Sequence, residues 1–331
     1  MKMFKGEKQM GKNSNVVHYK TKKEKRHKTW LQIKRNWVLY LFVLPVIIWY
    51  LIFDYWPMYG VQIAFQNYKI GETFGTSEWI GFKFFEQFFN SYWFPVVMKN
   101  TVMLSLLSFV LGFPLPIIIA LLLNEVVNTK FKKTVQTITY APHFISTVVL
   151  CGALQLFLSP ESGIIGVAVN AVREMMGLAD TNLLMNGPAF KWIYVLSGIW
   201  QGTGWGSVVY FAALSAVDLE QIEAARIDGA SKLQRIWYIN IPVLIPTIVI
   251  QLILQCGGLL SVGYQKVYLL QNDSILSYSE VISTYVYRAG INGAQFSFGT
   301  AIGLFNNVIN SVLMIVVNQI VRMVDKDMSM F

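Results

Sequence analysis

The chain has 331 residues, of which 54% are hydrophobic and only 14% are charged, and its mean hydropathy is +0.47. Soluble domains carry about 25% charged residues, and a globule of this size in water could not cover so much apolar surface. The composition therefore excludes an ordinary soluble fold and indicates a protein that crosses a lipid bilayer.

The net charge of +9 is concentrated in the N-terminal segment. Residues 1–36 hold 12 of the 27 Lys and Arg residues against two acidic residues, Glu7 and Glu24. A basic tail before the first apolar segment is typical of a cytoplasmic anchor that attracts anionic lipid headgroups. A nucleic-acid-binding arm is the alternative, but the tail lacks interleaved aromatic residues, so we expect a lipid membrane and no nucleic acid as its partner.

Six apolar segments follow the tail, and each is long enough to cross a bilayer as a helix. A hydrocarbon core about 30 Å thick requires roughly 20 such residues. The segments lie at residues 37–55, 100–123, 135–158, 192–217, 241–264 and 299–320. They predict an all-α transmembrane domain over residues 37–321, with about six spanning helices, and a short tail at residues 322–331.

The distribution of positive charge predicts the orientation of these helices. With the N-terminus inside, the cytoplasmic segments carry 20 of the 27 Lys and Arg residues. These segments are residues 1–36, 124–134, 218–240 and 321–331. The bias follows the positive-inside rule, so we expect both termini to be cytoplasmic.

The predicted outer loop at residues 58–99 is dense in aromatic residues, among them Phe88, Trp93 and Phe94. A belt of aromatic rings at the membrane interface is the interpretation that this composition favours. A docking surface for an external protein, or a platform for a sugar, is the alternative.

The predicted inner loop at residues 218–242 is rich in charge within an otherwise apolar chain. Its composition predicts a short helix at residues 219–227, which Gly229 can end in the left-handed conformation. Asp228 is expected to cap a second helix at residues 230–239.

The end of this loop leads into the fifth predicted span. Asn240 is expected to cap that helix, with Pro242 in its first turn, where a missing N–H costs little. Small side chains around Gly229 would allow another protein to approach closely. A hairpin that lies at the membrane surface without a partner is the alternative.

Three groups of letters in this loop have the spacing of a known motif: EAA at residues 223–225, DGA at 228–230 and INIP at 239–242. The pattern resembles the EAA motif of ABC importer permeases, although Ile241 stands where that family prefers Leu. The residues that the resemblance assigns to coupling with an ATPase are Glu223, Ala224, Ala225, Asp228, Gly229, Ala230 and Pro242. We call residues 218–242 the EAA loop.

Other stretches resemble the polysaccharide and oligosaccharide subgroup of the maltose-permease-like importers. They are YWPMYG at residues 55–60, ALLLNE at 120–125, PHFIS at 142–146, TYVYR at 284–288 and GLF at 303–305. The resemblance implies the type I ABC importer permease fold, a bacterial plasma membrane and the import of oligosaccharides.

The resemblance also implies the partners of such a subunit. They are a second homologous permease in a heterodimer, two copies of an ABC ATPase, an extracellular solute-binding lipoprotein and a glycan substrate. ATP and Mg²⁺ would be bound by the ATPase, because this sequence has no Gly-x-x-x-x-Gly-Lys-[Ser/Thr] loop. The chain itself is expected to be a pore subunit without enzymatic activity, cofactor or metal. Gly202, Gly204 and Gly206 imitate a nucleotide-binding loop weakly, but inside a predicted span they favour close helix packing.

Polar side chains at the depth of the lipid normally face protein or water. A sugar requires amides and hydroxyls, together with an aromatic face for its apolar side. The candidates for a substrate path are Gln201, Trp205, Gln255, Tyr264 and Asn306, and further polar positions are Gln251, Asn307 and Asn310. Hydrogen bonding between helices is the alternative for each of them.

Three other functions stay open on the sequence alone: a permease for a non-sugar solute, an intramembrane enzyme and a structural scaffold. An enzyme would need paired catalytic groups within the spans, which are nearly free of Asp, Glu and His. A scaffold would not require the spaced pattern around Gly229.

Overall fold

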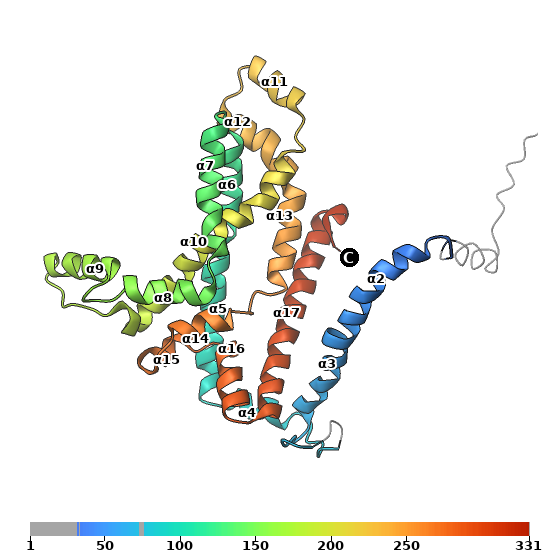
Figure 1. Cartoon of the computed structure of the whole chain (residues 1–331), viewed down its shortest axis with the longest axis vertical. Helices are drawn as coiled ribbons and strands as arrows, with labels where there is room; N and C mark the ends of the chain where they lie inside the picture. Colours follow the sequence, from blue (N-terminus) through green and yellow to red (C-terminus); the bar gives the residue numbers. More distant parts are fainter. Residues whose placement is uncertain (1–31, 33, 73–75, 331) are drawn as a thin grey trace, which may run out of the picture. The chain divides into compact units, whose positions relative to one another are not determined.

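The computed structural model describes residues 32, 34–72 and 76–330, and these residues form helices joined by turns (Figure 1). The chain divides into two compact units, Met1–Gly60 and Val61–Phe331, and each is described by itself. Most of the predicted basic tail at residues 1–36 lies outside the described residues.

The first unit contains one long helical run. Helix α2 (Trp37–Tyr50) continues through a π-helical turn (Leu51–Tyr55) and α3 (Trp56–Met58) into a 3₁₀ segment (Tyr59–Phe65) that enters the second unit. The run from Trp37 to Phe65 is apolar enough to cross a membrane. It begins where the first predicted span begins and extends beyond the predicted end.

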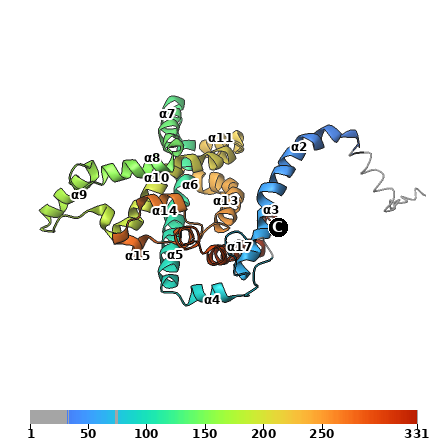
Figure 2. The same cartoon turned by 60° about the horizontal axis from the view of Figure 1, so that its bottom comes forward.

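The second unit is built around one long central helix, α10 (Gly187–Leu214), which packs against α5, α6, α7, α13 and α15. Helices α8 and α9 extend sideways from this bundle (Figures 1 and 2). The other helices of the unit are α4 (Lys83–Phe89), α5 (Trp93–Gly112), α6 (Pro114–Asn124), α7 (Thr129–Tyr140), α8 (Thr147–Phe157), α9 (Ile164–Met175), α11 (Leu219–Ile227), α12 (Lys232–Arg235), α13 (Ile241–Cys256), α14 (Tyr264–Leu270), α15 (Leu276–Ser279), α16 (Ile282–Tyr285) and α17 (Phe296–Val324).

Four of the described helical runs are long and apolar enough to cross a membrane, and a fifth joins them if the bent pair α7–α8 counts as one span. The four runs are Trp37–Phe65, Trp93–Asn124, Lys232–Cys256 and Phe296–Val324. Helix α10 has 28 residues and is long enough as well, but it is less apolar than these four. The six predicted spans correspond to the four runs, the bent pair and α10.

The third predicted span, at residues 135–158, is not one continuous helix, because the chain turns by 97° between α7 and α8. Pro142 has no N–H to continue the hydrogen-bond ladder of α7, and the backbone of Ile145 is extended. Ser146 then caps the new helix, because its hydroxyl accepts the amide of Val149 at 3.3 Å. The bend therefore separates two short helices.

Part of the aromatic segment at residues 58–99 belongs to the hydrophobic core. Phe88 on α4 is fully buried, and its ring lies 5.1 Å from that of Phe94 and 5.7 Å from that of Phe305 on α17. Phe82 and Tyr92 remain largely exposed. Both interpretations of the sequence placed these rings at a surface, whereas α4 uses its buried ring to pack against α5 and α17.

Candidate functional site

The EAA loop forms two helices at one end of the second unit, opposite the end where α4 lies (Figure 1). Asp218 caps α11 by accepting the amide of Glu220 at 2.9 Å. Ser231 caps α12 in a capping box with Gln234. The prediction that Asp228 caps the second helix was wrong, because Asp228 is the C-terminal cap residue of α11.

The turn between α11 and α12 has the conformation that the sequence predicts at Gly229. Its φ is +77°, in the left-handed region that L side chains resist. The amides of Gly229 and Ala230 donate to the carbonyls of Arg226 and Ala225 at 3.1 and 2.9 Å. These two bonds form a Schellman motif, which fixes the direction in which the chain leaves α11.

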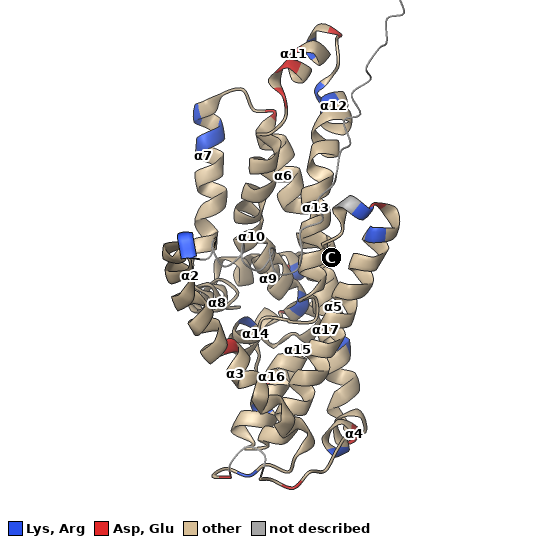
Figure 3. Cartoon of the chain, turned by 90° about the vertical axis from the view of Figure 1, so that its right-hand side faces the viewer, with Lys and Arg blue, Asp and Glu red and all other residues tan. Residues whose placement is uncertain are grey.

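Most of the residues assigned to ATPase coupling lie on the surface. Glu223, Ala224, Asp228, Gly229 and Pro242 are exposed, whereas Ala225 and Ala230 are half-buried. Basic residues on α7 and α12 and acidic residues on α11 lie at this end (Figure 3).

Large apolar side chains of the EAA loop are exposed beside these charges. They include Ile227, which is 87% exposed, and also Leu233 and Trp237. An apolar surface of this kind, rimmed by polar residues, marks a contact with a protein or a membrane.

The base of the EAA loop is tied to the end of α6 by a nearly buried ion pair. Arg235 Nη2 lies 2.8 Å from Glu125 Oε2, and the two side chains are only 8% and 15% exposed. Asn240, predicted to cap the fifth span, makes no capping bond and instead directs its Nδ2 toward Glu125 at 3.4 Å. It lies in a π-helical turn (Ile236–Asn240) that joins α12 to α13, and Pro242 occupies the first turn of α13 as predicted.

A second candidate site lies where the fifth predicted span is broken. The prediction of a continuous helix at residues 241–264 was wrong, because α13 ends at Cys256 and α14 begins only at Tyr264. Residues 257–263 are irregular and face α5 and α10 across a cavity of about 370 Å³. We call it the broken-helix pocket; it is lined by Leu104, Ser105, Ser108, Phe109, Tyr194, Leu254, Gln255, Gly258, Leu259, Ser261, Val262 and Gly263.

Side chains from three other helices satisfy the backbone of this irregular segment. The amide of Leu260 donates to Asn310 Oδ1 at 2.9 Å, and the amide of Gly263 donates to the Tyr194 hydroxyl at 3.2 Å. Ser283 donates to the carbonyl of Val262 at 3.0 Å. Irregular backbone at membrane depth persists only where it is satisfied in this way or lines a cavity, and here both conditions are met.

The broken-helix pocket offers polar atoms that are free to bind a ligand. Ser105 is 5% exposed, and its hydroxyl is buried without a hydrogen-bond partner among the described residues. Gln255, a predicted path residue, lies at the exposed end of α13 on the wall of the same pocket. A buried hydroxyl without a partner costs free energy, which a ligand hydroxyl would recover.

Three tyrosine rings form a cluster that begins where the irregular segment ends. Tyr264 directly follows the irregular segment, and its ring centre lies 5.3 Å from that of Tyr268 and 4.9 Å from that of Tyr287. The rings of Tyr268 and Tyr287 are 5.3 Å apart. Rings with hydroxyl groups can stack on the apolar face of a sugar and bind its hydroxyls at the edge.

The other predicted path residues lie elsewhere. Gln201 donates to the carbonyl of Ile145 at 2.7 Å, and the ring of Trp205 stacks on that of His143, with centres 4.9 Å apart. Both residues therefore hold the bend between α7 and α8. At these two positions the interactions are those of the helix-packing alternative.

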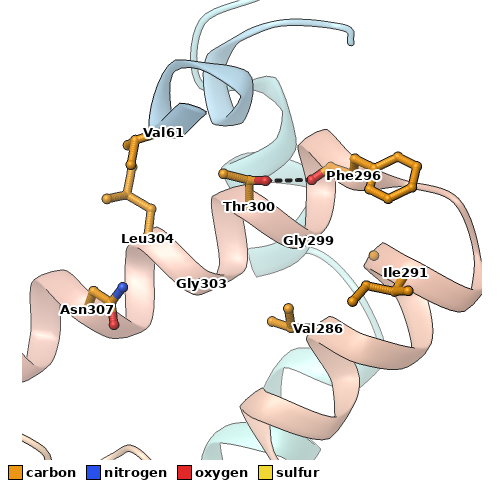
Figure 4. Close-up of a pocket in the computed structure, with 10 residues that line it drawn as sticks. Val61, Val286, Ile291, Phe296, Gly299, Thr300, Gly303, Leu304 and Asn307 are labelled. Atoms are coloured by element: carbon orange, nitrogen blue, oxygen red, sulfur yellow. Dashed lines mark hydrogen bonds between the residues drawn. The ribbon is translucent and has the colours of Figure 1, made fainter. Parts of the chain in front are cut away.

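The asparagines of α17 divide among three surroundings. Asn310 supports the irregular segment, whereas the buried Oδ1 of Asn306 has no partner among the described residues. Asn307 lines a separate cavity of about 360 Å³, together with Val61, Gly299 and Gly303 (Figure 4). The walls of that cavity are mostly apolar side chains and glycine.

Sequence reasoning missed Ser105, Tyr194, Tyr268 and Tyr287, because none of them lies in a polar cluster along the chain. The glycines at residues 257, 258 and 263, inside an apolar segment, are the sequence feature that could have indicated the pocket. Glycines that interrupt a predicted span are typical of discontinuous helices around transport sites.

Comparisons with known proteins identify the family to which the chain belongs. Residues 102–330 match the family model described as binding-protein-dependent transport system inner membrane component. The polygalacturonan/rhamnogalacturonan transport system permease protein YteP of Bacillus subtilis (strain 168) is 39% identical over 301 residues, which cover 91% of this chain and 92% of that protein.

Two solved structures are similar over nearly the same length. One is a bacterial ABC transporter involved in the import of the acidic polysaccharide alginate, of which one chain matches with a TM-score of 0.80 and 40% identity, covering 90% of this chain and 99% of that chain. The other is the bacterial alginate ABC transporter in complex with an alginate pentasaccharide-bound periplasmic protein, with a TM-score of 0.80, 41% identity, and coverage of 90% of this chain and 98% of that chain.

Proposed function

The chain belongs to the family of binding-protein-dependent transport system inner membrane components, and we propose that it is the permease subunit of an ATP-driven importer of acidic glycans. The observation that carries the proposal is the exposed EAA loop, whose Gly229 turn and apolar surface present a rigid docking element. A membrane subunit without a phosphate-binding loop needs such an element to receive energy from an ATPase.

We assign contact with the ATPase to the surface of α11 and to the turn that follows it. The residues are Glu223, Ala224, Ala225, Asp228, Gly229 and Ala230, with Pro242 at the base of the loop. The ATPase subunits would hold ATP and Mg²⁺, and this chain would hold no cofactor. The EAA loop and both termini would then face the cytoplasm, in agreement with the charge bias of the sequence.

Co-expression with the partner permease and the ATPase tests this assignment. We expect the ATPase to co-purify with the wild-type chain and to be lost from a Glu223→Lys variant that retains its thermal stability. An exposed lysine outside the loop gives the control, Lys130→Met, which should retain the ATPase. Full ATPase binding and ATP-dependent uptake in the Glu223→Lys variant would refute the assignment.

The broken-helix pocket supports a glycan as the transported solute. Ser105, Gln255 and Ser261 supply hydroxyl and amide groups, and the tyrosine rings at Tyr264 and Tyr268 supply aromatic faces. The pocket volume of about 370 Å³ is within the range of roughly 300–1,000 Å³ that small ligands occupy. A second homologous permease would close the other side of the path, and an extracellular binding lipoprotein would deliver the glycan.

An unpaired cation beside the pocket supports an acidic glycan. The Nζ atom of Lys266 is buried against α10, where it donates to the carbonyl of Tyr194 at 2.8 Å and lies 4.7 Å from the centre of that ring. Within the described part of the chain, no carboxylate forms an ion pair with it. Because Tyr194 also lines the pocket, the carboxylate of a uronic acid could supply the missing negative charge.

Uptake by the complete importer in proteoliposomes tests the substrate class. Oligogalacturonates should be imported, and neutral oligosaccharides of equal length, amino acids and peptides should not. Lys266→Met should reduce the uptake of the acidic glycan, whereas Lys191→Met should not. Equal uptake of neutral and acidic glycans would contradict the role given to Lys266, and import of a peptide or amino acid alone would contradict a sugar substrate.

A further inference from the structure

The ion pair between Glu125 and Arg235 joins two elements that are far apart in the sequence. Arg235 ends α12 and its Nη1 donates to the carbonyl of Ala230, at the turn of the EAA loop, at 3.0 Å. Its Nη2 reaches Glu125 Oε2 at 2.8 Å. One guanidinium group therefore connects the turn of the loop to the end of α6, and the pairing is nearly shielded from water.

The position of Glu125 makes this contact specific. Glu125 is the C-terminal cap residue of α6, where the partial negative charge of the helix disfavours a carboxylate. In the part of the chain that the structure describes, Arg235 is the cation that pairs with it. The Glu125 carboxylate is stabilised at this position by the Arg235 guanidinium. The pair therefore favours the one position of the EAA loop along α6, its register, in which the two groups meet.

A third residue extends the cluster into the next helix. Asn240 is 1% exposed, and its Nδ2 approaches Glu125 Oε1 at 3.4 Å. It closes the π-helical turn between α12 and α13, a kind of turn that is frequent at functional sites. Among the described residues, Asn240 Oδ1 and Arg235 Nε are buried without a hydrogen-bond partner. These two atoms could therefore form other hydrogen bonds after a small movement of the cluster.

Apolar packing alone would not fix this register. Ile222 of α11 and Ile236 pack against a core cluster that includes Leu121 of α6, Leu214 of α10 and Leu244 of α13. Hydrophobic contacts are non-directional and tolerate sliding, whereas a charged pair with defined donors does not. The ion pair is therefore the directional connection between the EAA loop and the helices of the bundle.

We propose that Glu125 and Arg235 are positioning residues for energy coupling, which hold the EAA loop in register with α6. A displacement of the loop by the ATPase then moves α6 and the central helix α10, against which α6 packs. Because α10 carries Tyr194 on the wall of the broken-helix pocket, this movement reaches the site assigned to the glycan. The inference rests on the proposed function, since it assumes that an ATPase acts on the EAA loop.

The test measures ATP hydrolysed per glycan imported by the complete importer, with its binding protein, in proteoliposomes. Glu125→Gln and Arg235→Met should still bind the ATPase but should use about tenfold more ATP per glycan, a factor within the usual range of coupling between sites. The charge-swapped variant, Glu125→Arg with Arg235→Glu, should recover part of the wild-type ratio. Lys130→Met, an exposed lysine at the same end of the bundle, should match the wild type.

A double apolar variant separates coupling from folding. Replacing a buried ion pair by apolar residues is often neutral for stability, so Glu125→Leu with Arg235→Met should keep the unfolding temperature of the complex and still lose coupling. A wild-type ratio of ATP to glycan in this stable variant would overturn the proposal. Loss of assembly in every variant, the charge-swapped one included, would overturn it as well, because the pair would then be needed for folding alone. A wild-type complex that shows no ATP-dependent uptake would instead refute the proposed function.

Discussion

Substitution of Gly204 by alanine should destabilise the chain, because α10 and α7 touch through their backbones at this point. A Cβ atom at Gly204 would lie 1.9 Å from the carbonyl oxygen of Thr139 and 2.4 Å from its carbonyl carbon. Real Cβ contacts are not shorter than 3.0 Å, so the shortfall is 1.1 Å (3.0 minus 1.9) and the two helices must move apart. Backbone atoms cannot rotate away as a flexible side chain can.

The expected change in the free energy of unfolding is the difference between two opposing effects. Overpacking costs about 1–3 kcal/mol, and more where the backbone must shift. Alanine in place of glycine inside a helix contributes about 1 kcal/mol in the opposite direction. Because the backbone must shift at Gly204, the upper end of the cost applies, and we expect Gly204→Ala to lower the free energy of unfolding by about 2 kcal/mol. Gly204→Leu should prevent normal assembly.

Gly202 provides the matched control on the same helix. No atom of the described residues lies within 4 Å of a Cβ built there, so Gly202→Ala should gain helix propensity without a clash and stabilise the chain by about 0.5–1 kcal/mol. Gly206, whose Cβ would meet Pro116 Cγ at 3.2 Å, should fall between the two. The assay is thermal unfolding of the purified complex in one detergent. Equal shifts for Gly202→Ala and Gly204→Ala would refute the close approach of α7 and α10.

Three further predictions concern the EAA loop, the broken-helix pocket and the ion pair between Glu280 and Arg288. Gly229→Asn should keep most ATP-dependent uptake, whereas Gly229→Val should lose it. The reason is that a left-handed conformation costs a branched residue about 1–2 kcal/mol, while Asn tolerates it. Equal uptake by both variants would show that the turn is not needed. Ser105→Ala and Gln255→Ala should raise the KM for the glycan several-fold without changing basal ATP hydrolysis, and an unchanged KM would remove the pocket from the path. Burial raises the pKa of the Glu280 carboxyl, and the Arg288 guanidinium at 3.4 Å opposes this effect, so Arg288→Gln should cost about 1–3 kcal/mol at neutral pH. That loss should shrink as the pH falls and Glu280 takes up a proton in the folded state, and a loss that grows toward low pH would contradict this assignment.

Local signals predicted the EAA loop more closely than the long spans. The first helix was expected at residues 219–227 and is found at Leu219–Ile227, because Asp218 and Gly229 end it through contacts within a few residues. The second helix, expected at residues 230–239, begins two residues later at Lys232, since both Asp228 and Ser231 can cap a helix and only the folded turn decides between them. Hydropathy located the spans but gave no signal for the 97° turn after α7, where Pro142 interrupts the helix and Ser146 caps the next one.

The predicted path residues show that residue type alone does not distinguish a polar side chain on a cavity wall from one that bonds a neighbouring helix. Gln201 and Gln255 are both glutamines within predicted spans, but the first donates to the carbonyl of Ile145 and the second lies on a cavity wall. The difference arises because the bend at Ile145 frees a carbonyl that only a neighbouring helix can satisfy. A single sequence does not show which polar side chains are used in this way.

Helix α13 places the EAA loop and the broken-helix pocket at the two ends of one element. It begins next to Asn240 in the polar cluster and ends at Cys256, directly before the irregular segment. Its 16 residues span about 24 Å at 1.5 Å per residue. Both ends are points of weak helical structure, a π-helical turn at one and glycines at the other. Gln255 lies one residue before the end of α13, so any movement of that end would displace Gln255 together with the irregular backbone of the pocket.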